Sequence, residues 1–318
     1  MKKMIAAILA LILALGLCAC GAAPAESTAA ETAGTDAQPA EETNADSFEA
    51  DKEKGLALFR DEDYEGAYEV LAQYADSGDA EISGVIGYCY YGGWGVEQDD
   101  VKAAEYEAKA ADAGYADAQL ELGYFYEYGY GVEQSYDKAL EYYTLASEQG
   151  NTIAMTNIGV MYECGNGVDK DPKRAVEYYQ KAADMGNAAG QANLASMYRD
   201  GNGVQKDYAK AVEYYTLAAE QDNLMALNNL AILYLEGKGV EADETKAMEL
   251  YTRAAELGEP YAQYNLGFSY FMGKGVEKDY AKAAYWYNEC VNNPNADEDI
   301  IKAASEQLEN PNVKAALK

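Results

Sequence analysis

A four-residue motif, Gly-x-Gly-Val, recurs through this chain at a constant interval and constrains the fold more than any other feature. The copies begin at Gly93, Gly129, Gly165, Gly201, Gly237 and Gly273. There are six copies, and each begins 36 residues after the previous one. A fixed period in this range is typical of a repeat array, in which each unit buries its apolar face against its neighbours. The sequence therefore predicts one array of similar units rather than several globular domains.

The residues on both sides of each motif predict two helices per unit. Upstream, an aliphatic and a small residue are followed by tyrosine, as in the segment Leu122–Tyr126. Downstream, a basic residue and alanine precede an aromatic pair, as in the segment Lys210–Tyr215. Spacings of three, four and seven residues place such side chains on one stripe of a helix. Each unit is therefore interpreted as helix A, a glycine-containing turn and helix B, and the fold class is an all-α, α/α solenoid.

Capping residues support these helix bounds. Asp171 directly precedes Pro172, an arrangement that suits an N-cap followed by proline at the first helical position. Helix B is expected to end at a left-handed glycine, which Asp222 replaces in one unit. The second glycine of each motif, for example Gly167, is also expected to adopt a positive φ, because valine there would be strained.

Together, these spaced positions resemble the Sel1-like repeat family, which is related to the tetratricopeptide repeat but has a longer, glycine-containing turn. The resemblance covers about residues 80–294, and many positions match in every copy. It implies a scaffold for protein–protein interactions and supplies no chemical reaction. In related repeat folds, helix A lines a concave surface, so the resemblance also implies that partners bind there.

Residues 1–19 are interpreted as a lipoprotein signal peptide. Lys2 and Lys3 precede Met4–Leu17, an apolar run of 14 residues that is short for a membrane span. The residues before Cys20 resemble a bacterial lipobox, so we expect lipidation of Cys20; an ordinary secretory signal is the alternative. Lipid chains would hold the protein to a membrane without a spanning helix. The expected location is the outer face of the bacterial cytoplasmic membrane, or the periplasmic side of an envelope membrane.

The remaining chain divides by composition and by the motif. Residues 20–46 are rich in alanine and acidic side chains and are expected to form a disordered acidic linker. Residues 47–79 lack the motif and resemble an ordinary tetratricopeptide unit. Six repeats follow over residues 80–295. Residues 296–318 are expected to form a capping helix, at Asp297–Leu308, and a tail.

Composition restricts the function classes. With 55 acidic and 24 basic residues, the chain has a net charge of −31 and no histidine. Such a negative surface repels nucleic acid, and it is compatible either with a merely solvated exterior or with a basic partner. The lack of histidine removes the usual general base and the commonest metal ligand. Gly-x-Gly-Val also lacks the Gly-Lys-Ser/Thr of a phosphate loop. We therefore expect no enzymatic activity, no catalytic residue, no cofactor and no metal.

Partner recognition is expected at helix-A positions that differ between units, because positions shared by all units serve the core. In the sixth unit these positions form a second apolar stripe, which either a partner or the capping helix covers. The predicted partner-binding residues are Tyr261, Tyr264, Phe268, Phe271, Tyr88, Tyr91, Tyr124 and Tyr128. The leading hypothesis is a membrane-anchored scaffold for a protein or peptide partner. The alternative is an envelope component that binds cell-wall glycan or peptidoglycan through its tyrosines.

Overall fold

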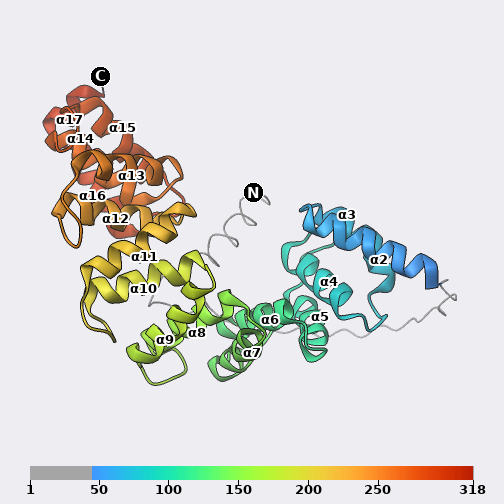
Figure 1. Ribbon diagram of the computed structural model, residues 1–318. Helices are drawn as coiled ribbons and strands as arrows, with labels where there is room; N and C mark the ends of the chain where they lie inside the picture. The colour runs from blue at the N-terminus through green and yellow to red at the C-terminus, as the bar shows by residue number, and fades with distance from the viewer. Residues whose placement is uncertain (1–44, 318) are drawn as a thin grey trace. The chain divides into compact units, whose positions relative to one another are not determined.

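The computed structural model describes residues 45–317, and this part of the chain contains helices and no strands (Figure 1). The predicted signal peptide, Cys20 and nearly all of the predicted linker lie outside the described residues. The chain forms two compact units, the first ending at Lys170 and the second beginning at Asp171. No helix within residues 45–317 has both the length and the apolar character needed to cross a membrane.

In the first unit, each helix packs against the next one along the chain. A short 3₁₀ turn, Ala72–Tyr74, follows the second of its helices. The helices are α2 (Ala45–Arg60), α3 (Tyr64–Leu71), α4 (Ala80–Gly92), α5 (Asp100–Asp112), α6 (Ala116–Tyr128), α7 (Tyr136–Glu148) and α8 (Thr152–Cys164). The pairs α4–α5 and α6–α7 are the helix A and helix B of the first two repeats, and α2–α3 is the unit that lacks the motif.

The second unit continues the same order and ends in two additional helices that pack on α15. Its helices are α9 (Pro172–Asp184), α10 (Ala188–Asp200), α11 (Tyr208–Glu220), α12 (Leu224–Glu236), α13 (Glu244–Glu256), α14 (Pro260–Met272), α15 (Tyr280–Val291), α16 (Glu298–Leu308) and α17 (Pro311–Ala316). The all-helical solenoid of helix pairs is therefore confirmed. Helix α16 lies where the sequence predicts a capping helix.

The helix ends follow the predicted capping chemistry. The Asp171 carboxylate accepts hydrogen bonds from the backbone N–H groups of Lys173 and Arg174, at 3.1 and 3.2 Å. Gly114 has a φ of +90° at the end of α5, and Asp222 adopts a φ of +60° at the equivalent position after α11. Aspartate tolerates this conformation better than most residues, which explains why the exception is accommodated.

In four of the six motifs, the second glycine permits a close approach between neighbouring repeats, at Gly131, Gly167, Gly203 and Gly239. Gly167 has a φ of +67°, so the predicted left-handed conformation is confirmed, and a β-carbon there would lie 2.1 Å from the Cβ of Tyr136. At Gly131 the equivalent distance is 1.9 Å to the backbone oxygen of Asp100. The turn of one repeat therefore rests on the first turn of helix B in the preceding repeat, at a distance that only glycine allows.

One tyrosine of helix B forms the centre of nearly every repeat. It lies against a glycine or alanine of helix A, and a β-carbon at Gly123 would lie 2.6 Å from the ring of Tyr143. The ring is buried in each of the five repeats that have it, as Tyr143, Tyr179, Tyr215, Tyr251 and Tyr287. In the first repeat the same register position is occupied by Glu107, which is also buried. The first repeat therefore has an acidic residue at the position where the other five repeats have a buried tyrosine.

Candidate functional site

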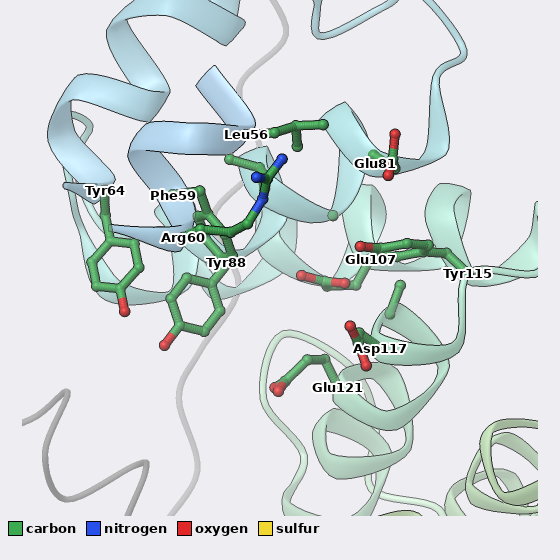
Figure 2. A pocket seen from close by; sticks show the side chains of 13 residues that line it. Leu56, Phe59, Arg60, Tyr64, Glu81, Tyr88, Glu107, Tyr115, Asp117 and Glu121 are labelled. Atoms are coloured by element: carbon green, nitrogen blue, oxygen red, sulfur yellow. The ribbon is translucent and has the colours of Figure 1, made fainter. Parts of the chain in front are cut away.

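A cavity in the first compact unit lies between the helices that lack the motif and the first two repeats. Its volume is about 490 Å³, which is within the range of pockets that bind ligands. Figure 2 shows the carboxyl group of Glu107 at the centre of the pocket, between side chains of α2–α4 and the acidic residues of α6. The pocket is lined by Leu56, Phe59, Arg60, Tyr64, Glu81, Gly84, Val85, Tyr88, Glu107, Tyr115, Asp117, Ala118 and Glu121.

Local sequence explains how α5 presents Glu107 to the pocket. Asp99 caps this helix by accepting a hydrogen bond from the backbone N–H of Lys102 at 3.1 Å. Facing it on α4 is Gly87, where a β-carbon would lie 2.8 Å from Oε1 of Glu107 and 3.1 Å from the carbonyl oxygen of Ala103. The missing side chain at Gly87 thus allows α4 and α5 to approach and leaves room for the carboxyl group.

Aromatic rings form one wall of the pocket. The Tyr88 ring lies 5.3 Å from both Phe59 and Tyr64, measured between ring centroids, and it stacks on Trp94 at 4.9 Å. Tyr115 lies on another side and is the N-cap residue of α6. Because Phe59, Tyr64 and Tyr88 come from three different helices, the wall is fixed by tertiary packing.

The opposite side of the pocket is acidic. Glu107 is only 2% exposed and forms no hydrogen bond or ion pair within residues 45–317. Burial, together with the charges of Glu121 and Asp117, raises the pKa of Glu107 well above its ordinary value. Burial and the charge of Asp117 raise the pKa of Glu121 to about 7. Glu81 also lines the pocket, and its carboxylate is paired with Lys52 at 2.7 Å.

Replacing Glu107 by glutamine is expected to stabilise the protein increasingly as the pH rises from about 5 towards the raised pKa of Glu107 in the folded protein. The folded state holds the Glu107 proton above the ordinary pKa of 4.5, whereas the unfolded state releases it. Stability of the native protein therefore falls with rising pH over this window, and glutamine removes the effect. Thermal unfolding at several pH values measures the difference. The control is Glu105→Gln, which removes the same charge from an exposed residue of the same helix. An equal dependence of Tm on pH in both variants would contradict the expectation.

The structure separates the predicted aromatic residues of the first two repeats. Tyr88 lines the pocket, but the other three lie beside the turn of the second repeat. Tyr124 contacts Tyr128 at 4.6 Å and Tyr130 at 5.7 Å, and Tyr91 contacts Tyr130 at 5.7 Å. Of the three, Tyr128 is exposed. These side chains form an aromatic cluster that is distinct from the pocket.

The predicted stripe of the sixth repeat is divided between packing and exposure. Tyr264 and Phe271 pack against the cluster that α16 and α17 complete. The Tyr261 hydroxyl donates a hydrogen bond to Oδ2 of Asp297, at 2.6 Å, although its ring is 44% exposed. Phe268 is 40% exposed. Half of the stripe is therefore part of the C-terminal core, and half remains accessible.

Several pocket residues were missed by the sequence reasoning, above all Glu107. Its signal is a departure from the repeat, because a glutamate stands where five other repeats have a tyrosine. Glu121 carries a similar signal, since Asn157 and Asn193 hold its position in later repeats. Phe59, Arg60 and Tyr64 lie in the unit without the motif, so no register could identify them. Among residues 45–317, no group of histidine, cysteine or acidic side chains is arranged to hold a metal ion.

Comparison with known proteins identifies similar repeats and similar folds. A family model described as "Sel1 repeat" matches residues 85–115, 116–151, 152–187, 188–223, 224–259 and 260–289. A Sel1 repeat protein from Oxalobacter formigenes is 32% identical, with a TM-score of 0.70, covering 76% of this chain and 96% of its own. A protective antigen of uropathogenic Escherichia coli that displays an SLR fold is 31% identical, with a TM-score of 0.52, covering 84% of this chain and 66% of its own. No curated protein sequence matches the chain.

Proposed function

The chain belongs to the Sel1 repeat family, and from this membership we propose that it is an exported, membrane-anchored scaffold that binds a protein partner. Repeats of this type generally mediate protein interactions and are generally non-catalytic. The observation that carries the proposal is the pocket of the first unit, which combines an aromatic wall with the buried carboxyl group of Glu107 and three further acidic side chains. Such a surface suits a partner with basic side chains, because aromatic faces and carboxylates both attract cations.

The aromatic cluster of the second repeat extends the proposed interaction surface. Tyr128 is exposed and contacts Tyr124, which is supported by Tyr130 from the turn. Rigid aromatic side chains of this kind contribute strongly to binding at interfaces. In the sixth repeat, the exposed rings of Tyr261 and Phe268 offer a second, smaller contact surface, while Tyr264 and Phe271 support the C-terminal helices.

Affinity capture from an envelope extract tests the scaffold function. The immobilised full-length protein is expected to retain a discrete protein, and retention is expected to fall when Tyr88 and Tyr128 are both replaced by alanine. Tyr285→Ala, which removes an exposed ring of α15 outside the proposed surface, is the control. Cosedimentation with purified cell wall, without capture of any protein, would instead favour the glycan-binding alternative.

Membrane attachment through Cys20 is proposed from the sequence alone. Lys2, Lys3 and the apolar run Met4–Leu17 fit an export signal, and Cys20 is the proposed lipid acceptor on the outer face of the cytoplasmic membrane or on the periplasmic side of an envelope membrane. Cys20→Ala is expected to leave unprocessed precursor or to release the protein from the membrane fraction, with loss of lipid labelling. Cys18→Ala is the matched control. Unchanged labelling and retention of the Cys20 variant would contradict the proposal.

A further inference from the structure

The pocket contains a carboxyl group that the fold of its own repeat does not require. Five repeats fill this register position with a buried tyrosine ring, and the first has Glu107, which is shorter than tyrosine and equally buried. The second repeat keeps Tyr143 against Gly123, which corresponds to Gly87 of the first repeat, and Gly87 in turn faces Glu107. A tyrosine is therefore compatible with the glycine that faces position 107, and the shorter glutamate side chain occupies less space than a tyrosine ring would.

A buried carboxyl group without a partner is destabilising, so its retention calls for an explanation outside folding. Glu107 forms no ion pair or hydrogen bond within residues 45–317, and its carboxyl group points into the pocket (Figure 2). The positively charged side chains nearby leave it unpaired: Lys52 binds Asp79 and Glu81, and Arg60 lies exposed at the edge. Asp117 and Glu121 add negative charge on the side of α6.

We propose that this pocket receives a lysine or arginine side chain from the partner protein, with Glu107 as the counter-ion at its base. The inference rests on the scaffold function proposed above and names the chemistry that the pocket recognises. The partner's ammonium or guanidinium group pairs with Glu107, and its aliphatic portion lies along Tyr88 and Phe59. The rings provide cation–π attraction and exclude water from the ion pair.

Binding is coupled to release of a proton. In the free pocket, burial raises the pKa of the Glu107 carboxyl and so favours its protonated form, whereas an incoming cation favours its ionised form. Affinity for a cation is therefore expected to rise with pH. The ionisable groups that face Glu107 are Arg60 of α2, Tyr64 of α3, Glu81 and Tyr88 of α4, and Tyr115, Asp117 and Glu121 at the start of α6. Burial and the charge of Asp117 raise the pKa of Glu121 to about 7, so this carboxyl group also makes the pocket more negative as the pH rises.

Tryptophan fluorescence gives a direct measurement of occupancy. The chain has two tryptophans, and Trp94 stacks on Tyr88 at the pocket wall. Trp286→Phe in the full-length protein leaves Trp94 as the reporter. The probes are capped heptapeptides of glycine and serine with one central lysine, arginine or norleucine, together with free butylammonium. The lysine and arginine peptides are expected to change the emission with saturation, the norleucine peptide is not, and the affinity is expected to be higher at pH 8 than at pH 5.5.

Two variants of Glu107 separate charge from shape. Glu107→Gln keeps the cavity and is expected to weaken binding of the lysine peptide by about tenfold or more. Glu107→Tyr fills the cavity with the residue used by the other repeats, and it is expected to abolish binding without lowering Tm. Unchanged peptide affinity in both variants would overturn the inference. Butylammonium binding as tightly as the lysine peptide would also overturn it, because the pocket would then be a site for free cations.

Capture of the protein partner by the same variants distinguishes this inference from the scaffold function. If Glu107→Tyr captures the partner as well as the native chain does, the scaffold function is supported, but the pocket is not the site that recognises the partner. If the lysine peptide binds but the native chain captures no protein, the pocket binds basic side chains and the scaffold function is contradicted. Joint loss of partner capture and peptide binding in Glu107→Tyr, with Tm preserved, is the result expected from both proposals.

Discussion

Replacing Gly131 by alanine is expected to lower the free energy of unfolding by about 2–5 kcal/mol, from a left-handed strain of about 1–2 kcal/mol and an overpacking cost of about 1–3 kcal/mol. Gly131 has a φ of +65°, and its β-carbon would lie 1.9 Å from the carbonyl oxygen and 2.3 Å from the carbonyl carbon of Asp100. Both atoms belong to the backbone at the start of α5, so a rotamer change cannot relieve the overlap. The turn must move away from the preceding repeat.

Gly114→Ala is the matched control for this prediction. Gly114 also has a positive φ, of +90°, but a β-carbon there would meet nothing within 4 Å. Its substitution is expected to cost only the backbone strain, about 1–2 kcal/mol. Chemical denaturation followed by circular dichroism measures both losses, and hydrogen exchange should show the Gly131 variant opening first at α5 and α6. Equal losses in the two variants would mean that the close approach contributes nothing.

Tyr143→Phe is expected to cost about 1.5–3 kcal/mol, the range for a buried hydrogen bond to a charged group. The Tyr143 hydroxyl donates a hydrogen bond to Oε2 of Glu127 at 2.7 Å, and both side chains are buried. Burial raises the pKa of Glu127, and the hydrogen bond from Tyr143 opposes that rise by stabilising the carboxylate. Phenylalanine fills the same space but leaves this carboxylate without its donor.

The same change at Tyr287 provides the comparison. Tyr287 occupies the equivalent register position in the sixth repeat, and its buried hydroxyl has no hydrogen-bond partner within the described residues. Tyr287→Phe is therefore expected to be neutral or slightly stabilising, by at most about 1 kcal/mol, because it removes an unsatisfied polar group. Unfolding of both variants under identical conditions gives the difference. A loss at Tyr287 as large as that at Tyr143 would show that the hydroxyl groups act through packing alone.

Local chemistry repeated at a fixed period made the fold predictable. The cap at Asp171 and the left-handed turn at Gly167 each depend on residues within a few positions along the chain, and six copies of the motif reinforce the assignment. The tyrosine at the centre of five repeats, for example Tyr143, belongs to the aromatic pair that the helical spacing placed on one stripe of helix B, and it is buried. These features follow from the backbone preferences of glycine, proline and aspartate and from the helical period.

The candidate site was less accessible to the same reasoning because it depends on contacts between distant segments. Tyr88 is predictable because it is a variable residue of helix A, whereas Glu107 lies on helix B. Acidic residues are abundant in this sequence, so composition does not distinguish Glu107 from the others. Only its burial in the folded protein does. Likewise, the covering of Tyr264 and Phe271 depends on where the C-terminal helices fold back, which periodicity within α14 does not determine.

The register position of Glu107 on helix B recurs in every repeat, so the proposed binding position could be built in another repeat. The same register position holds a buried tyrosine ring in five repeats and a buried glutamate in the first. Exchanging the two residues, by Glu107→Tyr together with Tyr215→Glu, would close the existing opening and create an acidic one three repeats further along the chain. With the proposed recognition at Glu107, such an exchange is expected to move the binding position along the array by point mutations alone, with no insertion, no new loop and no change in the number of repeats.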